Sequence, residues 1–518
     1  MSRSYAEPRR HAPPMFSASF EKLAEMVSYL GSAESFGVQH GELEGYLRRE
    51  GCDLLRRMLQ EHLDARAEAE QRVRVLDASG VARPHLRRSQ ERQLETLFGT
   101  VTVKRYLYQA PGQEGLAPAD AHLNLASDQF SHGVRCLIAY LVASGSYEEV
   151  VDHVQRFSGA QVAKRQVEEC AIRAAQDFDE FYASLPQEHC AEAEELVVIS
   201  TDAKGIVVRH QDLRAKTRQR AERNAHKLAT RLAPGEKRAR KRMAQVCAVY
   251  WVKPWVRSPD EIVGDVDERR KDRPRPQQKR VWASVKKPSK DMIAEAFDEA
   301  LRRDPEHQHR WVVLVDGDPR QLKRVKSEAR RVGAKVTIVV DIVHVLEYLW
   351  QAARALFSGS TPDAEVWVGN RLAELLNGRR GGDVARTIRR WRDKREEPLS
   401  SSELGSLNEA CDYLTDRKRT RIMRYDLALA EGFPIATGII EGACRYLVKD
   451  RMDRTGARWS LDGADAVLRL RALRASGDFD EYFRFHLRRE FERIHASRYM
   501  ERTPPPHPHR IPDLRLVA

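Results

Sequence analysis

No stretch of the 518-residue sequence approaches the ~20 consecutive apolar residues that a membrane-spanning helix needs. The first residues, MSRSYAEPRRHAPPM, are basic and rich in proline, and they lack the apolar segment of a secretory signal. Both absences argue against membrane and secreted proteins, so we expect a protein of the cytoplasm that does not bind a membrane.

Cysteine is also scarce, and none of the seven cysteines belongs to a C-x-x-C pair. An odd, scattered set argues against a disulfide framework, and the missing pairs argue against a structural zinc site. A reducing compartment fits this pattern. The seven residues are Cys52, Cys136, Cys170, Cys190, Cys247, Cys411 and Cys444.

Positive charge, in contrast, is in clear excess. The net charge of +13 and the pI near 9.4 are compatible with a polyanionic partner. Residues 212–243 hold 12 Lys or Arg against 3 Asp or Glu, so this segment alone carries an excess of 9. A solvated helix or flexible loop is one interpretation of such a run, and contact with nucleic acid is the other.

The N-terminal part of the chain has helical periodicity, and the length predicts about two to four domains. Residues 1–90 are expected to be helical. Residues 96–112, TLFGTVTVKRYLYQAPG, have a Gly-centred turn followed by alternating β-formers, which predicts a hairpin. Residues 145–175 indicate two helices around a Gly-containing turn. A DNA-binding helix-turn-helix and a plain helical hairpin both fit that pattern.

From residue 194 onward strands and helices alternate, which predicts a sheet covered by helices. After it, residues 356–435 lose all strand character and are expected to form a helical insertion. The proline-rich end of the chain is expected to be disordered. The expected strands are 195–200, 205–210, 244–252, 311–318 and 335–341, and the expected helices are 290–304, 319–333 and 342–357.

Three acidic residues stand out because each follows an apolar segment: Asp202, Asp316 and Glu441. The carboxyl ends of strands line the rim of a sheet, where ligands bind. Carboxylates gathered there suit Mg²⁺, which keeps waters and accepts phosphate oxygens. Turn formation is the alternative for both aspartates. Asp318 we assign to an N-cap, because proline follows it.

The order of these elements resembles the ribonuclease-H-like core of DDE transposases. Two segments, VDIVHVLEYLWQAA (340–353) and GIIEGACRYLVKDRMDRTGARWS (438–460), resemble the signature segments of ISKra-type insertion-sequence transposases in the Mutator-like group. The resemblance extends from about residue 97 to 492. It implies that Asp202, Asp316 and Glu441 form the catalytic metal-binding triad. It also matches Asp341 and His344 to an Asp-x-x-His pair, although Asp341 is equally placed to cap the following helix.

The resemblance implies a bacterial, nucleoid-associated enzyme that binds the terminal inverted repeats of an insertion sequence. Two Mg²⁺ or Mn²⁺ ions per active site would support strand cleavage and transfer to double-stranded target DNA, without a covalent protein intermediate. Two element ends imply a homodimer or larger assembly. Many relatives carry a C-x-x-C knuckle after the hairpin, whereas this chain reads YQAPGQEG, so no zinc-assisted DNA contact is expected there.

The cations around Glu441 have two interpretations. On an α-helix Glu441, Arg445 and Lys449 share one face. An exposed salt bridge from Glu441 to Arg445 is one possibility, and a metal ligand followed by phosphate-binding cations is the other. Trp459 is expected to stack on an unpaired base. The expected DNA-binding residues are Arg445, Lys449, Arg451, Arg454, Arg458, Trp459, Lys237, Arg238, Arg240, Lys241 and Arg242.

The expected fold is therefore multidomain α+β, with an N-terminal DNA-binding region followed by a ribonuclease-H-like core. Two rival functions stay open: a domesticated, non-catalytic DNA-binding protein, and a nuclease without strand transfer. The expected divisions are a helical region (1–90), a hairpin with helix-turn-helix (91–190), the first part of the core (191–355, with the basic insertion 212–243), a helical insertion (356–435), the core's C-terminal helical part (436–495) and a disordered tail (496–518).

Overall fold

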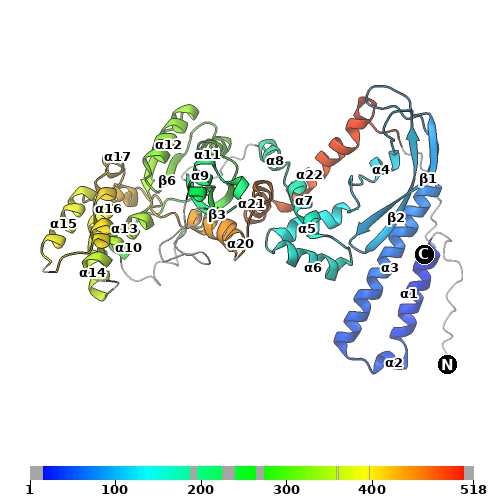
Figure 1. Ribbon diagram of the computed structural model, residues 1–518, viewed down its shortest axis with the longest axis horizontal. Coiled ribbons are helices and arrows are strands. Elements are labelled where there is room, and N and C mark those ends of the chain that lie inside the picture. Colours follow the sequence, from blue (N-terminus) through cyan, green and yellow to red (C-terminus); the bar gives the residue numbers. More distant parts are fainter. Residues whose placement is uncertain are drawn as a thin grey trace. The chain divides into compact units, whose positions relative to one another are not determined.

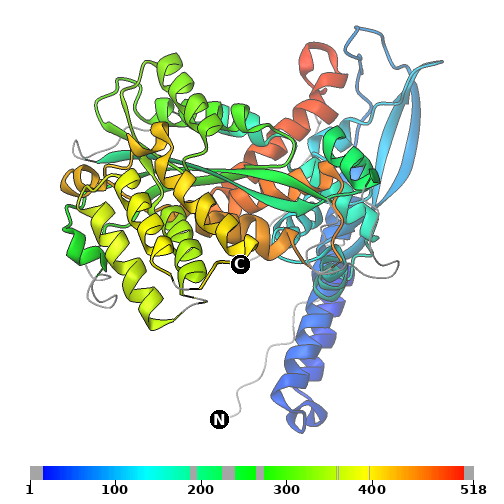
Figure 2. The same ribbon diagram turned by 60° about the vertical axis from the view of Figure 1, so that its left-hand side comes forward.

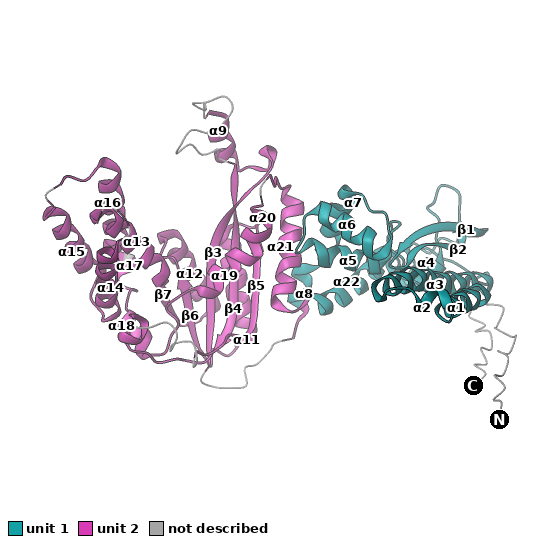
Figure 3. Ribbon diagram, turned by 90° about the horizontal axis from the view of Figure 1, so that it is seen from below, with its two compact units in different colours: residues 1–183, 479–518 teal, residues 184–478 magenta. Residues whose placement is uncertain are grey.

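The computed structural model describes residues 16–186, 195–223, 240–263, 273–357, 359, 361–395, 397–454 and 456–506, apart from the side chain of Lys418. The chain divides into two compact units, Met1–Ala183 with Phe479–Ala518 (unit 1) and Ser184–Asp478 (unit 2) (Figure 3). Together they contain many helices, a two-stranded sheet and a five-stranded sheet, so the fold is mixed α and β. None of the helices in these ranges combines the length and hydropathy needed to span a bilayer.

Unit 1 begins with helices, as the periodicity predicted. The N-terminal helices are α1 (Ser17–Leu30), α2 (Ala33–Phe36) and α3 (His40–Glu68). Glu61 of α3 accepts hydrogen bonds from the start of α1, where its Oε1 lies 2.9 Å from the Ala18 nitrogen. Lys22 and Glu50 pair at 2.6 Å further along. These contacts join α1 to α3.

The predicted hairpin is present, but its first strand lies in part of the chain expected to be helical. Strand β1 (His85–Thr96) pairs antiparallel with β2 (Gly99–Gln109). The expectation of helix up to residue 90 is therefore wrong after Glu68, where α3 ends: residues 70–84 contain no helix, and β1 begins at His85. The β1 sequence HLRRSQERQLET is almost wholly polar, so no hydrophobic period marks it as a strand. Its pairing with β2 and the packing of Leu94 against Val101 and Val103 make it one.

The rest of unit 1 is a helical layer. It contains α4 (Pro118–His122), α5 (His132–Val142), α6 (Tyr147–Ser158), α7 (Lys164–Ala174), α8 (Phe178–Ser184) and α22 (Phe479–Ile494). The two helices predicted around a glycine turn are α6 and α7. Gly159 ends α6 with φ of 74°, a left-handed conformation that glycine adopts without strain.

Two expectations for the C-terminal part differ from the structure. Helix α22 belongs to unit 1 rather than to the core, because its Glu490 pairs with Arg135 at 3.2 Å and its Tyr482 hydroxyl donates to the Ala174 carbonyl at 2.6 Å. The following residues, up to 506, are described and include the 3₁₀ turns Ala496–Arg498 and Met500–Arg502. Tyr499 between them is 3% exposed, so burial of its ring explains why this stretch is ordered. The remaining tail residues lie outside the described part.

Unit 2 is built on the five-stranded sheet (Figure 3). The strands are β3 (Leu196–Val207), β4 (Lys241–Val252), β5 (Gln277–Ser284), β6 (Arg310–Val315) and β7 (Val336–Val340), in the order β5-β4-β3-β6-β7. Strand β4 runs antiparallel to β3 and β5, while β3, β6 and β7 are parallel. The alternation predicted from the sequence is confirmed.

One detail of that prediction is wrong. Residues 195–200 and 205–210 were expected as two strands joined by a turn at TDAKG, but β3 continues through them. Strand β4 pairs with β3 along its whole length, from Leu196 opposite Val252 to Val207 opposite Lys241. The ladder holds residues 203–205 extended, and Asp202 lies within the strand rather than at its end.

Helices surround the sheet. Helix α11 (Ser289–Arg303) and the short α19 (Gly438–Ala443) both pack on β3 and β4, and α21 (Leu461–Ser476) packs on β5. The other helices next to the sheet are α12 (Pro319–Val332), α13 (Ile342–Leu356), the π-helix Cys444–Lys449 and α20 (Asp450–Met452). Two further short helices, α9 (Ala215–Arg223) and α10 (Pro259–Val263), lie in the connections beside β4.

The segment expected to be a helical insertion is helical. It contains α14 (Pro362–Leu376), α15 (Gly381–Asp393), α16 (Ser401–Thr415), α17 (Arg417–Thr420) and α18 (Tyr425–Ala430). Helices α14 and α16 pack on α13, and α15 packs on α16. Figure 1 and Figure 2 both show this bundle beside the sheet, in yellow and yellow-green.

Candidate active site

Three aspartates lie just beyond the parallel-paired parts of three neighbouring strands: Asp202 lies within β3, and Asp316 and Asp341 directly follow β6 and β7. In the pairing of β3 with β6, Ser200 lies opposite Leu314, so Asp202 and Asp316 occupy equivalent positions two residues further on. In the pairing of β6 with β7, Val315 lies opposite Val340, so Asp316 and Asp341 are equivalent in the same way. The strands are parallel, so all three aspartates lie along one edge of the sheet.

Asp202 and Asp316 are close enough to interact electrostatically. Burial raises the pKa of Asp316, and the negative charge of Asp202 raises it further. Two opposing influences are a hydrogen bond from the Asp318 nitrogen, at 2.8 Å, and the charge of His344. Two ionised carboxylates held together repel each other, and a bound cation relieves that repulsion.

Asp202 has two partners of its own. Its Oδ1 accepts a hydrogen bond from the Ala203 nitrogen at 2.6 Å, and its Oδ2 accepts one from the Cys444 thiol at 3.2 Å. Burial raises the pKa of Cys444 well above its usual range, as does the Asp202 charge. The thiol therefore stays protonated and orients one oxygen of Asp202. This contact could not be predicted from local sequence, because 242 residues separate the two side chains.

Asp318 is an N-cap, as predicted. Its Oδ1 accepts hydrogen bonds from the backbone nitrogens of Arg320 (2.8 Å) and Gln321 (3.1 Å) at the start of α12. Between the two acids, Gly317 has φ of +85°. A β-carbon at this position would lie 2.7 Å from Nε of Arg419, so the turn from Asp316 to Asp318 requires glycine.

Asp341 caps helix α13 and also binds Thr437. It is 2% exposed, and its Oδ1 accepts from the nitrogens of Val343 (2.9 Å) and Thr437 (3.2 Å). Its Oδ2 accepts from the Thr437 hydroxyl. Thr437 is the residue just before α19, so Asp341 fixes the start of the helix that carries Glu441. With three donors already bound, this carboxylate has little free capacity for a metal ion.

His344 lies one turn into α13. Its ring Nδ1 is 3.2 Å from Oε2 of Glu347, and about a third of its side chain is exposed (34%). Its charge acts on Asp316, as noted above. The two residues of the Asp-x-x-His pair therefore differ: Asp341 is buried and binds Thr437, whereas the partly exposed imidazole of His344 lies near Asp316.

Glu441 is exposed on α19, and within the described residues its carboxylate makes no hydrogen bond or ion pair. Its helix packs on β3 and β4, and the next turn of chain carries the Cys444 that touches Asp202. No set of three His, Cys, Asp or Glu side chains in the described ranges is close enough together to hold a metal ion. The structure thus brings Asp202 and Asp316 together and leaves Glu441 outside that pair.

The chain after Glu441 is a π-helix rather than the α-helix assumed for the shared face. Residues Cys444–Lys449 form this wider turn, and π-turns are frequent at functional sites. Glu441, Arg445 and Lys449 are all exposed nevertheless. Arg445 pairs with Asp450, five residues on, at 3.8 Å from Nε to Oδ1. The alternative of a salt bridge from Arg445 to Glu441 is therefore wrong.

Two residues expected on the DNA-binding surface are buried. Trp459 is 6% exposed, and its indole nitrogen donates to the Met452 carbonyl at 3.0 Å. Arg451 is 4% exposed and stacks on Trp459, 4.8 Å from the ring centroid. The expectation that Trp459 stacks on a base is wrong, because the ring is buried, Arg451 covers it and its nitrogen is bound to Met452. Arg454 and Arg458 are exposed, as expected.

The basic segment 212–243 connects β3 to β4, and only part of it is described. Arg240 and Lys241 are exposed, and Lys241 pairs with Asp453 at 3.6 Å. Arg242 donates to the carbonyls of Val285 (3.0 Å) and Asp212 (3.1 Å), so its contacts are within the protein. The expected DNA-binding residues Lys237 and Arg238 lie outside the described residues.

Three residues of the helical segment that support the aspartate edge were not predicted from the sequence. The Tyr413 hydroxyl donates to the carbonyl of Asp316 at 2.8 Å, and Nε of Arg419 donates to the carbonyl of Gly317 at 3.1 Å. The Tyr425 hydroxyl donates to the carbonyl of Val340, just before Asp341, at 3.0 Å.

Two of these side chains, Tyr413 and Arg419, also contact each other. The guanidinium of Arg419 stacks on Tyr413 at 3.8 Å from the ring centroid, and its Nη1 donates to the Tyr413 carbonyl at 2.6 Å. Burial raises the pKa of Tyr413 well above its usual range, so the hydroxyl remains a donor. The sequence contained one indication of these contacts: tyrosines on packed helices usually find hydrogen-bond partners for their buried hydroxyls.

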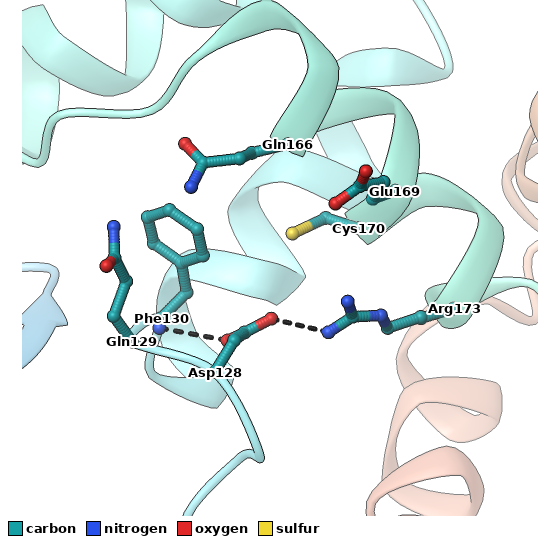
Figure 4. Close-up of a pocket in the computed structure, with 7 residues that line it drawn as sticks. All are labelled: Asp128, Gln129, Phe130, Gln166, Glu169, Cys170 and Arg173. Carbon is teal, nitrogen blue, oxygen red and sulfur yellow. Dashed lines mark hydrogen bonds and ion pairs between the residues drawn. The ribbon is translucent and has the colours of Figure 1, made fainter.

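Unit 1 contains a separate cavity of about 260 Å³ on one side of α7 (Figure 4). Its lining includes an ion pair of 2.6 Å between Asp128 and Arg173. At the other end of α7, Arg165 pairs with Glu169 at 2.9 Å, and Lys164 pairs with Glu148 of α6. The cations of this helix are thus paired within the protein, and both the helix-turn-helix and the helical-hairpin interpretations remain open. The lining residues are Asp128, Gln129, Phe130, Gln166, Glu169, Cys170 and Arg173.

The aspartate edge in unit 2 is therefore the strongest candidate for a functional site in the described chain. Its residues come from β3, from the ends of β6 and β7 and from the chain on either side of α19, and the helical segment 356–435 supports them. No family model matches the sequence, and no curated protein is significantly similar to it.

Proposed function

We propose that the protein is a DDE-type DNA transposase of an insertion sequence, which cleaves DNA at the element's ends and joins them to a target. The observation that carries this proposal is the pairing of Asp202 with Asp316. They occupy equivalent positions on adjacent parallel strands, and burial raises the pKa of Asp316, as does the charge of Asp202. Such a carboxylate pair at the edge of a sheet is suited to phosphoryl-transfer chemistry.

The order of elements supports a ribonuclease-H-like core. Along the chain, β3 with Asp202 is followed by β4, β5, α11, β6 with Asp316, α12 and β7, and α19 with Glu441 comes late. This is the order that the resemblance of the sequence implied. The antiparallel β4 lies beside β3 in a sheet whose other half is parallel, which is consistent with the same core.

The donor set fits Mg²⁺ or Mn²⁺. Asp202 and Asp316 are hard oxygen ligands whose mutual repulsion favours a cation between them, and two carboxylates suffice for an ion that keeps waters and binds substrate phosphates. Glu441, exposed and without a partner among the described residues, is the third candidate ligand. When bound, two such ions would activate the attacking oxygen and stabilise the leaving oxygen.

The protein's own residues position this chemistry. Asp341 fixes the start of the Glu441 helix through Thr437, and Tyr413 and Arg419 hold the backbone that carries Asp316. The exposed cations around Glu441, namely Arg445, Lys449, Arg454 and Arg458, are placed to contact phosphates. In this proposal the hairpin and helices of unit 1 bind the terminal repeats, and a homodimer or larger assembly brings two ends together.

The experiment is to incubate the purified protein with labelled DNA that carries both ends of its element, with and without Mg²⁺. We expect Mg²⁺-dependent cleavage at the ends and joining of precut ends to a second DNA. Asp202→Ala, Asp316→Ala and Glu441→Ala should each abolish both reactions and spare end binding, while the cap variant Asp318→Asn serves as the matched control. Cleavage without joining would identify a nuclease, and binding without either reaction would identify a domesticated DNA-binding protein.

A further inference from the structure

Helix α12 carries an unusually one-sided charge. Its sequence, PRQLKRVKSEARRV, contains six Lys or Arg and a single acid, Glu328. The buried face consists of Leu322, Val325 and Ala329, and the opposite side is exposed. The exposed cations are Arg320, Lys323, Lys326, Arg330 and Arg331.

Most of these cations have no acidic partner. Arg331 pairs with Asp298 at 2.7 Å and also with Glu328. Within the described residues, Arg320, Lys323, Lys326 and Arg330 form no ion pair. The sole acid of the helix is thus neutralised by its last arginine, and the rest of the exposed face carries uncompensated positive charge.

The same helix begins at the candidate active site. Asp316 lies three residues before α12, and Asp318 caps it. Gln321 in the first turn donates through Nε2 to the carbonyl (3.0 Å) and the hydroxyl (2.9 Å) of Thr201, the residue before Asp202. The helix is therefore attached to the strands of both aspartates, and its cations lead away from them.

The length of the cationic face matches a nucleic-acid backbone. From Arg320 to Arg330 an α-helix rises ~15 Å, at 1.5 Å per residue. One strand of duplex DNA carries a phosphate every ~3.4 Å along its axis, so this face spans about four phosphates.

We propose that the exposed face of α12 binds the phosphate backbone of the duplex DNA next to the reacting bond. This rests on the proposed function, since it assumes that the substrate of the aspartate edge is DNA. The cations are exposed, so they contact phosphates without a large desolvation cost. Phosphate contacts carry no base information, so this surface should bind all duplex sequences equally.

The test compares two triple variants. The first neutralises three cations of α12 (Arg320→Gln, Lys323→Gln, Lys326→Gln). The matched control removes three exposed cations from α15 and its C-cap (Arg386→Gln, Arg390→Gln, Lys394→Gln), and this helix of the same unit packs on α16 rather than on the sheet. Affinity for an element-end duplex and for an unrelated duplex is measured between about 50 and 200 mM salt. Thermal unfolding checks that all variants fold.

For the α12 variant we expect the slope of log affinity against log salt to fall by ~0.9 per lost contact, or ~2.7 in all. That corresponds to a loss of affinity on the order of 100-fold at 0.15 M salt for both duplexes. The α15 control should keep the wild-type slope. A charge-preserving variant of α12 (Arg320→Lys, Lys323→Arg, Lys326→Arg) should also keep it.

Contrary outcomes separate the two proposals. An unchanged slope in the α12 variant, with a wild type that cleaves element ends, would overturn the α12 surface and leave the transposase function standing. A reduced slope in a protein that shows no cleavage would retain the DNA-binding surface and remove the catalytic function. A wild type that binds neither duplex would overturn both, and loss of binding to element ends alone would assign base recognition to α12 instead.

Discussion

Replacing Asp341 by alanine removes a buried carboxylate that accepts three hydrogen bonds, from the Val343 nitrogen and from the nitrogen and hydroxyl of Thr437. Loss of the cap of α13 costs about 0.5–2 kcal/mol. Leaving the Thr437 donors buried without partners adds about 1–3 kcal/mol. We therefore expect Asp341→Ala to destabilise the protein by about 1.5–5 kcal/mol, the sum of the two costs, and to reduce cleavage by displacing the Glu441 helix.

Asp341→Asn separates this structural role from metal binding. The asparagine oxygen still accepts from the two backbone nitrogens, and its amide can donate to the Thr437 hydroxyl, so the loss of stability should stay below about 1.5 kcal/mol. Cleavage activity should be largely retained. Thermal unfolding and the cleavage assay are measured on the same preparations, with Asp316→Asn as the inactive control. Complete loss of cleavage at an unchanged melting temperature would show that Asp341 is a metal ligand and does not act only by holding Thr437.

Three further predictions concern stability. Gly317→Ala should destabilise the protein by more than Gly333→Ala, because the new β-carbon at 317 meets Arg419, whereas at 333 φ is also positive but no atom lies within 4 Å. Equal melting temperatures of the two variants would contradict the close contact between Arg419 and the turn after Asp316. Trp459→Ala should lower the free energy of unfolding by about 3–5 kcal/mol, as expected for a buried aromatic ring. A variant of normal stability that has lost only its binding of single-stranded DNA would contradict this structural role. Burial lowers the pKa of His132 from 6.5 to about 4. As pH falls from 6.5 to about 4, the ring is protonated in the unfolded state but not in the folded state, so the free energy of unfolding should fall by up to about 3 kcal/mol. In His132→Gln, the free energy of unfolding measured by chemical denaturation should vary less with pH over that range. The same variation as in the wild type would show that His132 does not cause it.

Local sequence signals predicted several features of unit 2 correctly. The apolar runs before Asp316 and Asp341 are short and end in buried residues, so the ends of β6 and β7 could be placed from the sequence. The cap at Asp318 depends only on its own neighbours, Pro319 and Gln321. Such features need no knowledge of distant parts of the chain.

Features that depend on distant partners were missed. Strand β3 runs through TDAKG because β4 pairs with it, and β1 is a strand because β2 is its partner. The contacts from Tyr413 to Asp316 and from Arg419 to Gly317 join residues 97 and 102 positions apart. Trp459 was assigned to the surface because it follows a run of arginines, whereas burial of the large ring decides its position.

Direct measurement of divalent-metal binding tests the central claim, that Asp202 and Asp316 together form a cation site. Free Mn²⁺ is titrated by electron paramagnetic resonance in the presence of the wild type, Asp202→Asn, Asp316→Asn and the cap variant Asp318→Asn. We predict that the wild type and Asp318→Asn bind Mn²⁺ and that each of the other two variants loses that binding while remaining folded. Equal Mn²⁺ binding by all four proteins would contradict the assignment of the site to this pair of aspartates.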